Sequence, residues 1–161
     1  MSFIVVFVIT LLILFASVYV TKRRFGILGL ALAAGSVISS MWVTSLTPII
    51  ANAGIIIVSP PLKTVVAATL ILTPAIILLF RGPTYKSRIH RIIAASAFAV
   101  LAVAFLLETM GSALVIDSAG RQVYLFILEQ KSLIITFALI FAVADIFMTK
   151  TPKHSLNTPK H

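Results

Sequence analysis

The sequence predicts an all-α polytopic membrane protein with about five transmembrane helices, and three observations lead to this fold class. Of its 161 residues 60% are hydrophobic and only 11% are charged, whereas a soluble domain usually carries about a quarter charged residues. The apolar residues fall into long runs, and a helix needs roughly 20 such residues to cross about 30 Å of hydrocarbon. The basic residues cluster between these runs.

Five spans account for the apolar runs. The first two are uncharged, and the third has Lys63 at its edge and Pro74 inside it. Arg91 and Glu108 flank the short fourth span, where their long side chains can reach the membrane surface. The fifth is apolar apart from Asp145. The predicted spans cover residues 3–20, 25–46, 62–80, 92–107 and 132–149.

Two connections between the spans are unusual. Residues 47–61 are bounded by prolines but apolar, and they are too few to cross a membrane, so we expect them to lie in the interface or to re-enter the bilayer. Residues 109–131 include the apolar run 123–128, which predicts a helix on the membrane surface leading into the last span. Residues 1–150 form one membrane domain, and the basic tail 151–161 is predicted to be disordered because it has little to bury.

The basic residues predict the orientation of the chain. Basic residues accumulate on the cytoplasmic side of short loops. Ten of the 13 Lys and Arg residues lie in segments 22–24, 81–91 and 150–160, which five spans place on one face. We therefore expect the amino terminus outside, the carboxyl terminus in the cytoplasm and the lipid bilayer as the main partner. The net charge of +9 is explained by topology, so we expect no nucleic-acid partner.

The composition argues against several chemical functions. The chain has no cysteine, which excludes disulfides, thiolate metal sites and thiol catalysis. Its three histidines, His90, His154 and His161, lack a second ligand at helical spacing, so we expect no metal site. No glycine-rich loop follows the pattern that holds phosphates. We expect no catalytic residue and no cofactor, and hence no enzyme.

The second span is rich in small residues. Gly29 with Ala33, and Gly35 with Ser39, are pairs four residues apart that let another helix approach closely. In lipid this close approach is a main source of helix association. These pairs predict packing within the chain or, alternatively, a homo-oligomer or a larger membrane complex.

Asp145 is the one acid inside a predicted span. Arg91 lies on the alanine-rich face of the fourth span, and Asp145 shares a face of the fifth with Ala142. If the two faces pack antiparallel, Arg91 and Asp145 meet near the cytoplasmic end, and we predict an ion pair. Arg88 and Arg81 are the alternative partners. A proton or cation relay through Asp145, and simple extension of its side chain to the surface, stay open.

Pro74 interrupts the third span. It lacks a backbone donor and so frees the carbonyl of Leu70, which predicts a kink. The hydroxyls of Thr69 and Thr73 are near enough in sequence to compensate. A single proline in a membrane helix is ordinary, although kinked helices also occur in transporters and channels.

Three features occur together in this chain: its hydropathy pattern, the residues 23–26, Arg-Arg-Phe-Gly, ahead of the small-residue helix, and Gly82-Pro83 with the basic stretch to Arg91. In these features the chain resembles the CvpA (colicin V production protein) family of small bacterial inner-membrane proteins. The family has Arg-Gly-Phe at the first junction, whereas here Gly26 follows Phe25. The resemblance implies a bacterial inner-membrane location and a role in envelope or export physiology.

These observations lead to two hypotheses about function. The first is a non-catalytic membrane protein of CvpA-like type that acts as a scaffold or accessory subunit. The alternative is a channel or transporter component that uses Asp145 and the kinked third span.

Overall fold

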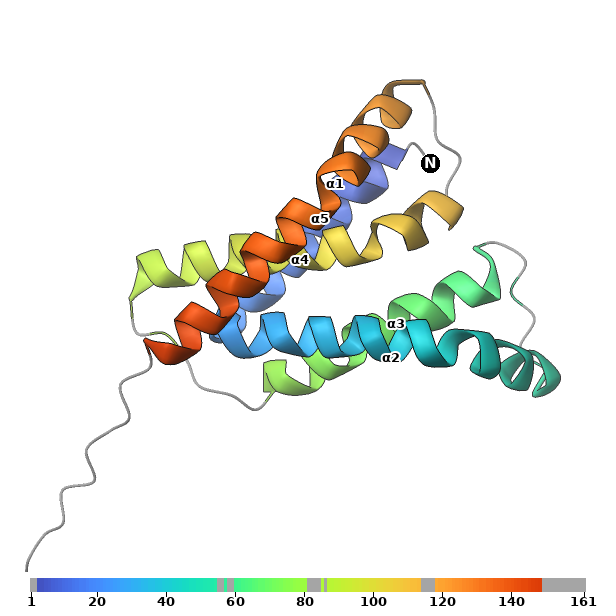
Figure 1. Cartoon of the computed structure of the whole chain (residues 1–161), viewed down its shortest axis with the longest axis horizontal. Helices are drawn as coiled ribbons and strands as arrows, with labels where there is room; N and C mark the ends of the chain where they lie inside the picture. Colours follow the sequence, from blue (N-terminus) through green and yellow to red (C-terminus); the bar gives the residue numbers. More distant parts are fainter. Residues whose placement is uncertain are drawn as a thin grey trace, which may run out of the picture.

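The computed structural model describes residues 3–54, 57, 60–80, 85, 87–113 and 118–148. Within these residues it has five helices and no strand, which confirms the predicted all-α class (Figure 1). Each helix is long and apolar enough to cross a membrane. The helices are α1 (Phe3–Thr21), α2 (Phe25–Asn52), α3 (Leu62–Phe80), α4 (Arg88–Ala113) and α5 (Ser118–Phe147). The predicted tail, 151–161, lies outside the described residues.

The second helix is longer than predicted. The helix does not end at residue 46, as the predicted span does, but continues to Asn52 with Pro48 inside it, and the interfacial or re-entrant position of 47–61 stays a prediction. Pro48 has no N–H to donate to the carbonyl of Thr44, and the neighbouring Thr47 hydroxyl donates to the carbonyl of Val43 at 2.6 Å. The helix ends at Asn52, and Gly54, two residues later, has a φ of +87° that favours glycine. Residues 55, 56, 58 and 59 lie outside the described part of the chain.

The fourth and fifth helices also extend past their predicted ends. Glu108 lies inside α4, and Lys131 lies inside α5, which runs without a break from Ser118 through the run predicted as a separate surface helix. The prediction of a surface helix at 123–128 is therefore wrong, because these residues are part of α5. The ammonium of Lys131 donates to the Glu108 carboxylate at 2.6 Å. Because each charge neutralises the other, neither has to mark the end of a span.

The five helices form an antiparallel bundle with two orientations of helix. Figure 1 shows α2 and α3 side by side, with α1 and α5 inclined to the other three helices. Helix α4 packs against α1, α2, α3 and α5, and it is the most buried of the five. One end of the bundle gathers the end of α1, the start of α2, the end of α3, the start of α4 and the end of α5. Because Lys22, Arg23, Arg24, Arg88 and Arg91 lie there, we call it the basic end.

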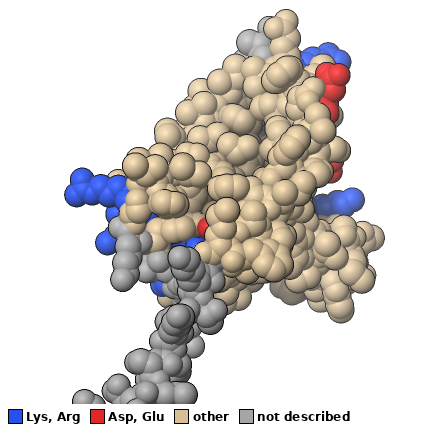
Figure 2. All heavy atoms as spheres, turned by 60° about the vertical axis from the view of Figure 1, so that its left-hand side comes forward, with Lys and Arg blue, Asp and Glu red and all other residues tan. Residues whose placement is uncertain are grey.

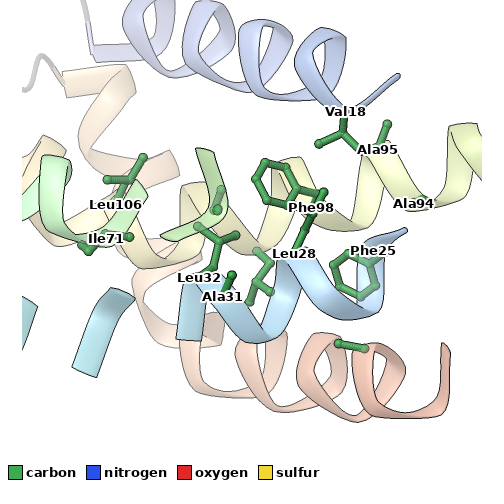
Figure 3. Close-up of a cluster of buried hydrophobic side chains, with 14 residues drawn as sticks. Val18, Phe25, Leu28, Ala31, Leu32, Ile71, Ala94, Ala95, Phe98 and Leu106 are labelled. Atoms are coloured by element: carbon green, nitrogen blue, oxygen red, sulfur yellow. The ribbon is translucent and has the colours of Figure 1, made fainter. Parts of the chain in front are cut away.

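Short side chains on α4 allow this central position. Phe98 of α4 points toward Leu28 and Leu32 of α2, and Val18 of α1 lies beside Ala95 of α4 (Figure 3). Alanine side chains let neighbouring helices approach where bulkier residues hold them apart. The core of the bundle is therefore a layer of aromatic and branched residues set between alanines.

The outer surface is apolar over the length of the bundle. Helices α1 and α5 bury little of their apolar surface within the chain, and Leu12, Ile13, Phe137 and Phe147 are all exposed. Figure 2 shows wide uncharged surface, with Lys, Arg, Asp and Glu gathered mainly toward its two ends. A surface of this kind is stable in lipid and not in water.

The small residues of α2 pack within the chain. A side chain at Gly35 would clash with the backbone carbonyl of Ile71 in α3, and the Ser39 hydroxyl donates to the α3 backbone at 3.4 Å. A Cβ on Gly29 would lie 3.1 Å from the Cβ of Ala142 in α5. Both glycines singled out in the sequence thus hold α2 close to a neighbouring helix of the same chain.

Candidate functional site

The basic end holds a cluster of polar contacts around Asp145. The carboxylate accepts a hydrogen bond from the backbone N–H of Gly26 at 2.9 Å through Oδ2 and one from the Tyr85 hydroxyl at 2.5 Å through Oδ1. The guanidinium Nη2 of Arg24 lies 3.6 Å from Oδ1. We call Arg24, Gly26, Tyr85 and Asp145 the Asp145 cluster.

Asp145 caps the first turn of α2 from another helix. The N-cap residue of α2 is Arg24, whose side chain makes no capping hydrogen bond. The first N–H groups of a helix lack partners within the helix and carry partial positive charge, so a carboxylate there is favourable. Asp145, from the last turn of α5, supplies the missing acceptor to Gly26.

Gly26 is required by this close approach. A Cβ at this position would lie 2.5 Å from the carbonyl oxygen of Ala142 and 3.0 Å from Oδ2 of Asp145. Those contacts are too short for any side chain, so only glycine lets α5 come near enough for the hydrogen bond. Although the sequence places Gly26 at a basic junction, it does not reveal which helix comes close to it.

Tyr85 joins the loop between α3 and α4 to the cluster. Its backbone N–H donates to the carbonyl of Lys22 at 2.8 Å, and the Arg24 guanidinium lies 5.2 Å from its ring centre. Burial and the hydrogen bond to Asp145 raise the pKa of Tyr85 from 10.0 to about 12. The hydroxyl therefore stays protonated, as a donor, throughout the physiological range.

The predicted Arg91–Asp145 pair is wrong. Arg91 instead donates through Nη2 to the carbonyl of Tyr19 at 2.7 Å, and its guanidinium lies 4.6 Å from the centre of the Tyr19 ring. It thus binds the last turn of α1, where partial negative charge favours a cation. Arg88 is exposed and forms no ion pair with Asp145, and Arg81 lies outside the described residues. The prediction failed because Asp145 and Ala142 face α2 rather than the alanine face of α4.

Arg23 plays a similar part at the end of α3. It donates through Nε to the carbonyl of Leu79 at 2.9 Å and through Nη2 to that of Phe80 at 2.7 Å. Consecutive arginines thus bind different helices, Arg23 at the end of α3 and Arg24 at the acid of α5. From the sequence alone, Arg23 and Arg24 indicate only the topology of the chain. The preference of Arg for the C-terminal carbonyls of helices is the one signal that could have indicated the contact of Arg23 with α3.

The end of α1 brings these residues together. Lys22 adopts a left-handed conformation, with φ of +58°, and its N–H donates to the carbonyl of Val18 at 2.9 Å. This is the αL form of helix ending, which usually uses glycine. The turn it makes directs the chain from α1 into the Arg23–Arg24 pair within two residues.

Pro74 lies apart from the Asp145 cluster. The predicted compensation by threonine hydroxyls at the freed Leu70 carbonyl is absent, because Thr69 donates to the Val65 carbonyl and Thr73 to the Thr69 carbonyl. The Leu70 carbonyl instead faces Gly35, where a Cβ would lie 3.0 Å away. The carbonyl of Leu70, which has no backbone donor because of Pro74, therefore lies at the close contact between α2 and α3.

The Asp145 cluster borders a small cavity of about 280 Å³ that His90 and Ser87 also line. The contacts of the cluster join three segments of chain, the start of α2, the loop at Tyr85 and the end of α5, while Nε of Arg24 is buried without a hydrogen-bond partner among the described residues. No family model matches the chain, and comparison with curated proteins and with solved structures likewise finds no match. What is established is a polytopic membrane protein with five apolar helices tied together at one end by buried charges.

Proposed function

We propose that this membrane protein is a non-catalytic scaffold or accessory subunit of CvpA-like type, acting in envelope or export physiology at the bacterial inner membrane. The observation that carries the proposal is the engagement of Asp145 on both carboxylate oxygens by three groups from two other segments, the start of α2 and the loop that holds Tyr85. An acid in a membrane helix is by default a candidate for transport chemistry. Here it has structural partners instead.

A relay would require Asp145 to exchange its partners. If Asp145 gave up its present contacts in order to bind and release a proton, the first turn of α2 would lose its cap and the Arg24 guanidinium would lose its acid. Both losses destabilise the bundle. Arg91 and Arg23 add two further ties between helix ends. A rigid end of this kind suits a protein that presents a fixed surface to a partner.

The alternative, a channel or transporter component, has one observation in its favour. A groove between α2, α3, α4 and α5 in the other half of the bundle is lined by Ser36, Ser39, Ser40 and the Glu108–Lys131 pair. Ser36 lies ten residues after Gly26 on α2, a separation of about 15 Å along the helix. Asp145 and Pro74 do not line the groove, so a path would have to pass through the packed core around Leu32.

Reconstitution separates the two functions. The purified protein is placed in liposomes with a pH gradient and an internal pH-sensitive dye, and empty liposomes and Asp145→Asn liposomes serve as controls. The scaffold proposal predicts dissipation no faster than in empty liposomes. Dissipation that is faster with the natural protein and slower with the variant would reject it in favour of transport.

The scaffold proposal also predicts a companion. Light scattering of the detergent-solubilised protein, with affinity purification from its own membranes, should yield either a homo-oligomer or a stoichiometric second protein. A chain recovered solely as a monomer under mild detergent would contradict the proposal.

The orientation that we propose places the basic end in the cytoplasm. Its support is the gathering of basic residues at the end where α1, α3 and α5 terminate. A reporter that is active only in the cytoplasm, fused after His161, should be active, whereas the same reporter fused before Phe3 should not. The reverse pattern would overturn the orientation.

A further inference from the structure

The groove at the opposite end from the Asp145 cluster has the composition of a ligand site. Its volume is about 400 Å³, within the range of small-molecule sites, and residues of α2, α3, α4 and α5 line it. The polar lining consists mainly of hydroxyls of α2 and the Glu108–Lys131 pair of α4 and α5. Val43 and Ile135 supply apolar lining beside these groups.

The groove offers more acceptors than donors. Ser36, Ser39 and Ser40 each donate their hydroxyl proton to a backbone carbonyl, at 2.7, 3.4 and 2.8 Å respectively. Their oxygens therefore keep lone pairs for a ligand but have no proton left to give. The Glu108 carboxylate also accepts, and its side chain is 68% exposed. A ligand group with several N–H donors, such as a primary ammonium, matches these acceptors.

One cation complements the acceptors. Lys131 is 20% exposed and contacts Oε1 of Glu108 at 2.6 Å. A ligand with both a phosphate and an ammonium can insert beside this pair, with the phosphate on Lys131 and the ammonium on Glu108, and leave the net charge of the groove unchanged. An anionic phosphate alone would also face the Glu108 carboxylate, and a quaternary ammonium has no N–H to donate.

The depth of the groove favours a lipid over a dissolved molecule. Lys131 precedes Asp145 by 14 residues on α5, or about 21 Å along the helix. With Asp145 near one boundary of roughly 30 Å of hydrocarbon, the Lys131 backbone lies about 9 Å inside the other boundary, and its long side chain can extend its ammonium toward the level of the lipid phosphates. Val37, also in the lining of the groove, is 57% exposed, so the groove opens toward lipid.

We propose that this groove binds a phospholipid with a phosphoethanolamine head group, with an acyl chain alongside Val43 and Ile135. The phosphate contacts Lys131, and the ammonium contacts Glu108 and the serine oxygens of α2. This inference stands on the groove alone and holds whether the protein is a scaffold or a transporter.

Native mass spectrometry of the full chain in detergent tests the assignment. The protein is titrated with phosphatidylethanolamine, phosphatidylcholine and phosphatidylglycerol of identical acyl chains, and bound lipid is counted. We expect one retained phosphatidylethanolamine, with about tenfold weaker retention of the other two lipids, the effect of about one charge-assisted hydrogen bond. Equal retention of the three, or a preference for phosphatidylglycerol, would overturn the proposal. Competition by soluble glycerophosphoethanolamine as strong as by the lipid would overturn the lipid source.

Matched variants locate the site. Lys131→Met and Glu108→Gln should each abolish the preference, whereas Lys63→Met and Glu129→Gln, which make the same charge changes on exposed residues outside the groove lining, should keep it. If breaking the ion pair unfolds the protein, Ser40→Leu fills the groove at an exposed position and leaves the pair intact. Preserved preference in a folded Ser40→Leu protein would overturn the assignment to this groove.

Discussion

The Arg24–Asp145 ion pair predicts non-additive losses of stability. The two side chains are 18% and 12% exposed, and the closest charged atoms are 3.6 Å apart. With an effective dielectric constant of about 20 the gross attraction is about 4–5 kcal/mol, and the desolvation of both groups offsets much of it. Removing Asp145 leaves the Arg24 guanidinium buried without this carboxylate, and removing Arg24 leaves Asp145 with its hydrogen bonds to Gly26 and Tyr85 but without this cation. Arg24→Gln and Asp145→Asn should therefore each lower the free energy of unfolding by about 2–4 kcal/mol.

The double variant should lose less than the sum of the two single losses. We expect a coupling of about 1–3 kcal/mol, because the second substitution removes a charge that has already lost its partner. The assay is unfolding by SDS titration in mixed micelles, followed by the far-ultraviolet circular dichroism of the helices. A second cycle, with Arg91→Gln in place of Arg24→Gln, serves as the control and should be additive to within about 0.5 kcal/mol, since Arg91 binds α1 instead.

Two results would refute this reasoning. Additivity in the Arg24 cycle would mean that the ion pair contributes nothing beyond the separate environments of its members. Strong coupling in the Arg91 cycle together with none in the Arg24 cycle would mean that α5 packs against α4 at this end, as its alanine pattern first indicated.

Three further substitutions test the rest of the bundle. Gly35→Ala should lower the free energy of unfolding by about 1–3 kcal/mol, because the added methyl group meets the α3 backbone. Ser40→Ala, at an exposed position of the same helix, is the control and should change it by less than about 0.5 kcal/mol in the same titration. Equal effects of the two substitutions would contradict close packing of α2 on α3. Arg91→Gln should lower the free energy of unfolding by about 1–2 kcal/mol, because the donor to the Tyr19 carbonyl is lost. Arg88→Gln, at an exposed position, is the control and should leave stability unchanged. An Arg91→Gln protein as stable as the natural one would contradict the role of Arg91 at the end of α1. Tyr85→Phe should lower stability below pH 10, and its difference from the natural protein should shrink between pH 10 and 12, because there the unfolded chain loses the phenolic proton while the folded chain, with a pKa of about 12, retains it. A difference that widens across that window would contradict the raised pKa.

The helices themselves could be predicted from the sequence, because hydrocarbon imposes a length on each apolar run. The bounds of α3 agree with the predicted 62–80, and those of α1 differ by one residue. The ends of α2 and α4 were placed too early and the start of α5 too late. Pro48, Glu108 and Lys131 are local signals for a boundary, but α2 continues through Pro48, and Glu108 and Lys131 pair with each other from different helices.

The Asp145 cluster could be predicted only in part. The position of the acid in the fifth span indicated that it needs a partner near the basic end, which is correct. Periodicity indicates which face of a helix is buried, but not which neighbour covers it. The partner is decided by Gly26, because the absence of a side chain there lets α5 approach α2. That preference exists only in the packed bundle and leaves no mark in a local window of sequence.

The bond between Gly26 and Asp145 also sets the order in which the protein can be completed. The two residues are 119 positions apart, so at a synthesis rate of about 5–20 residues per second the junction after α1 has no acid for about 6–24 s. During that time the guanidinium of Arg24 lacks the carboxylate with which it pairs in the folded chain. A chain that stops before α5 also lacks the acceptor that caps the first turn of α2, so both contacts form only when the last helix is made.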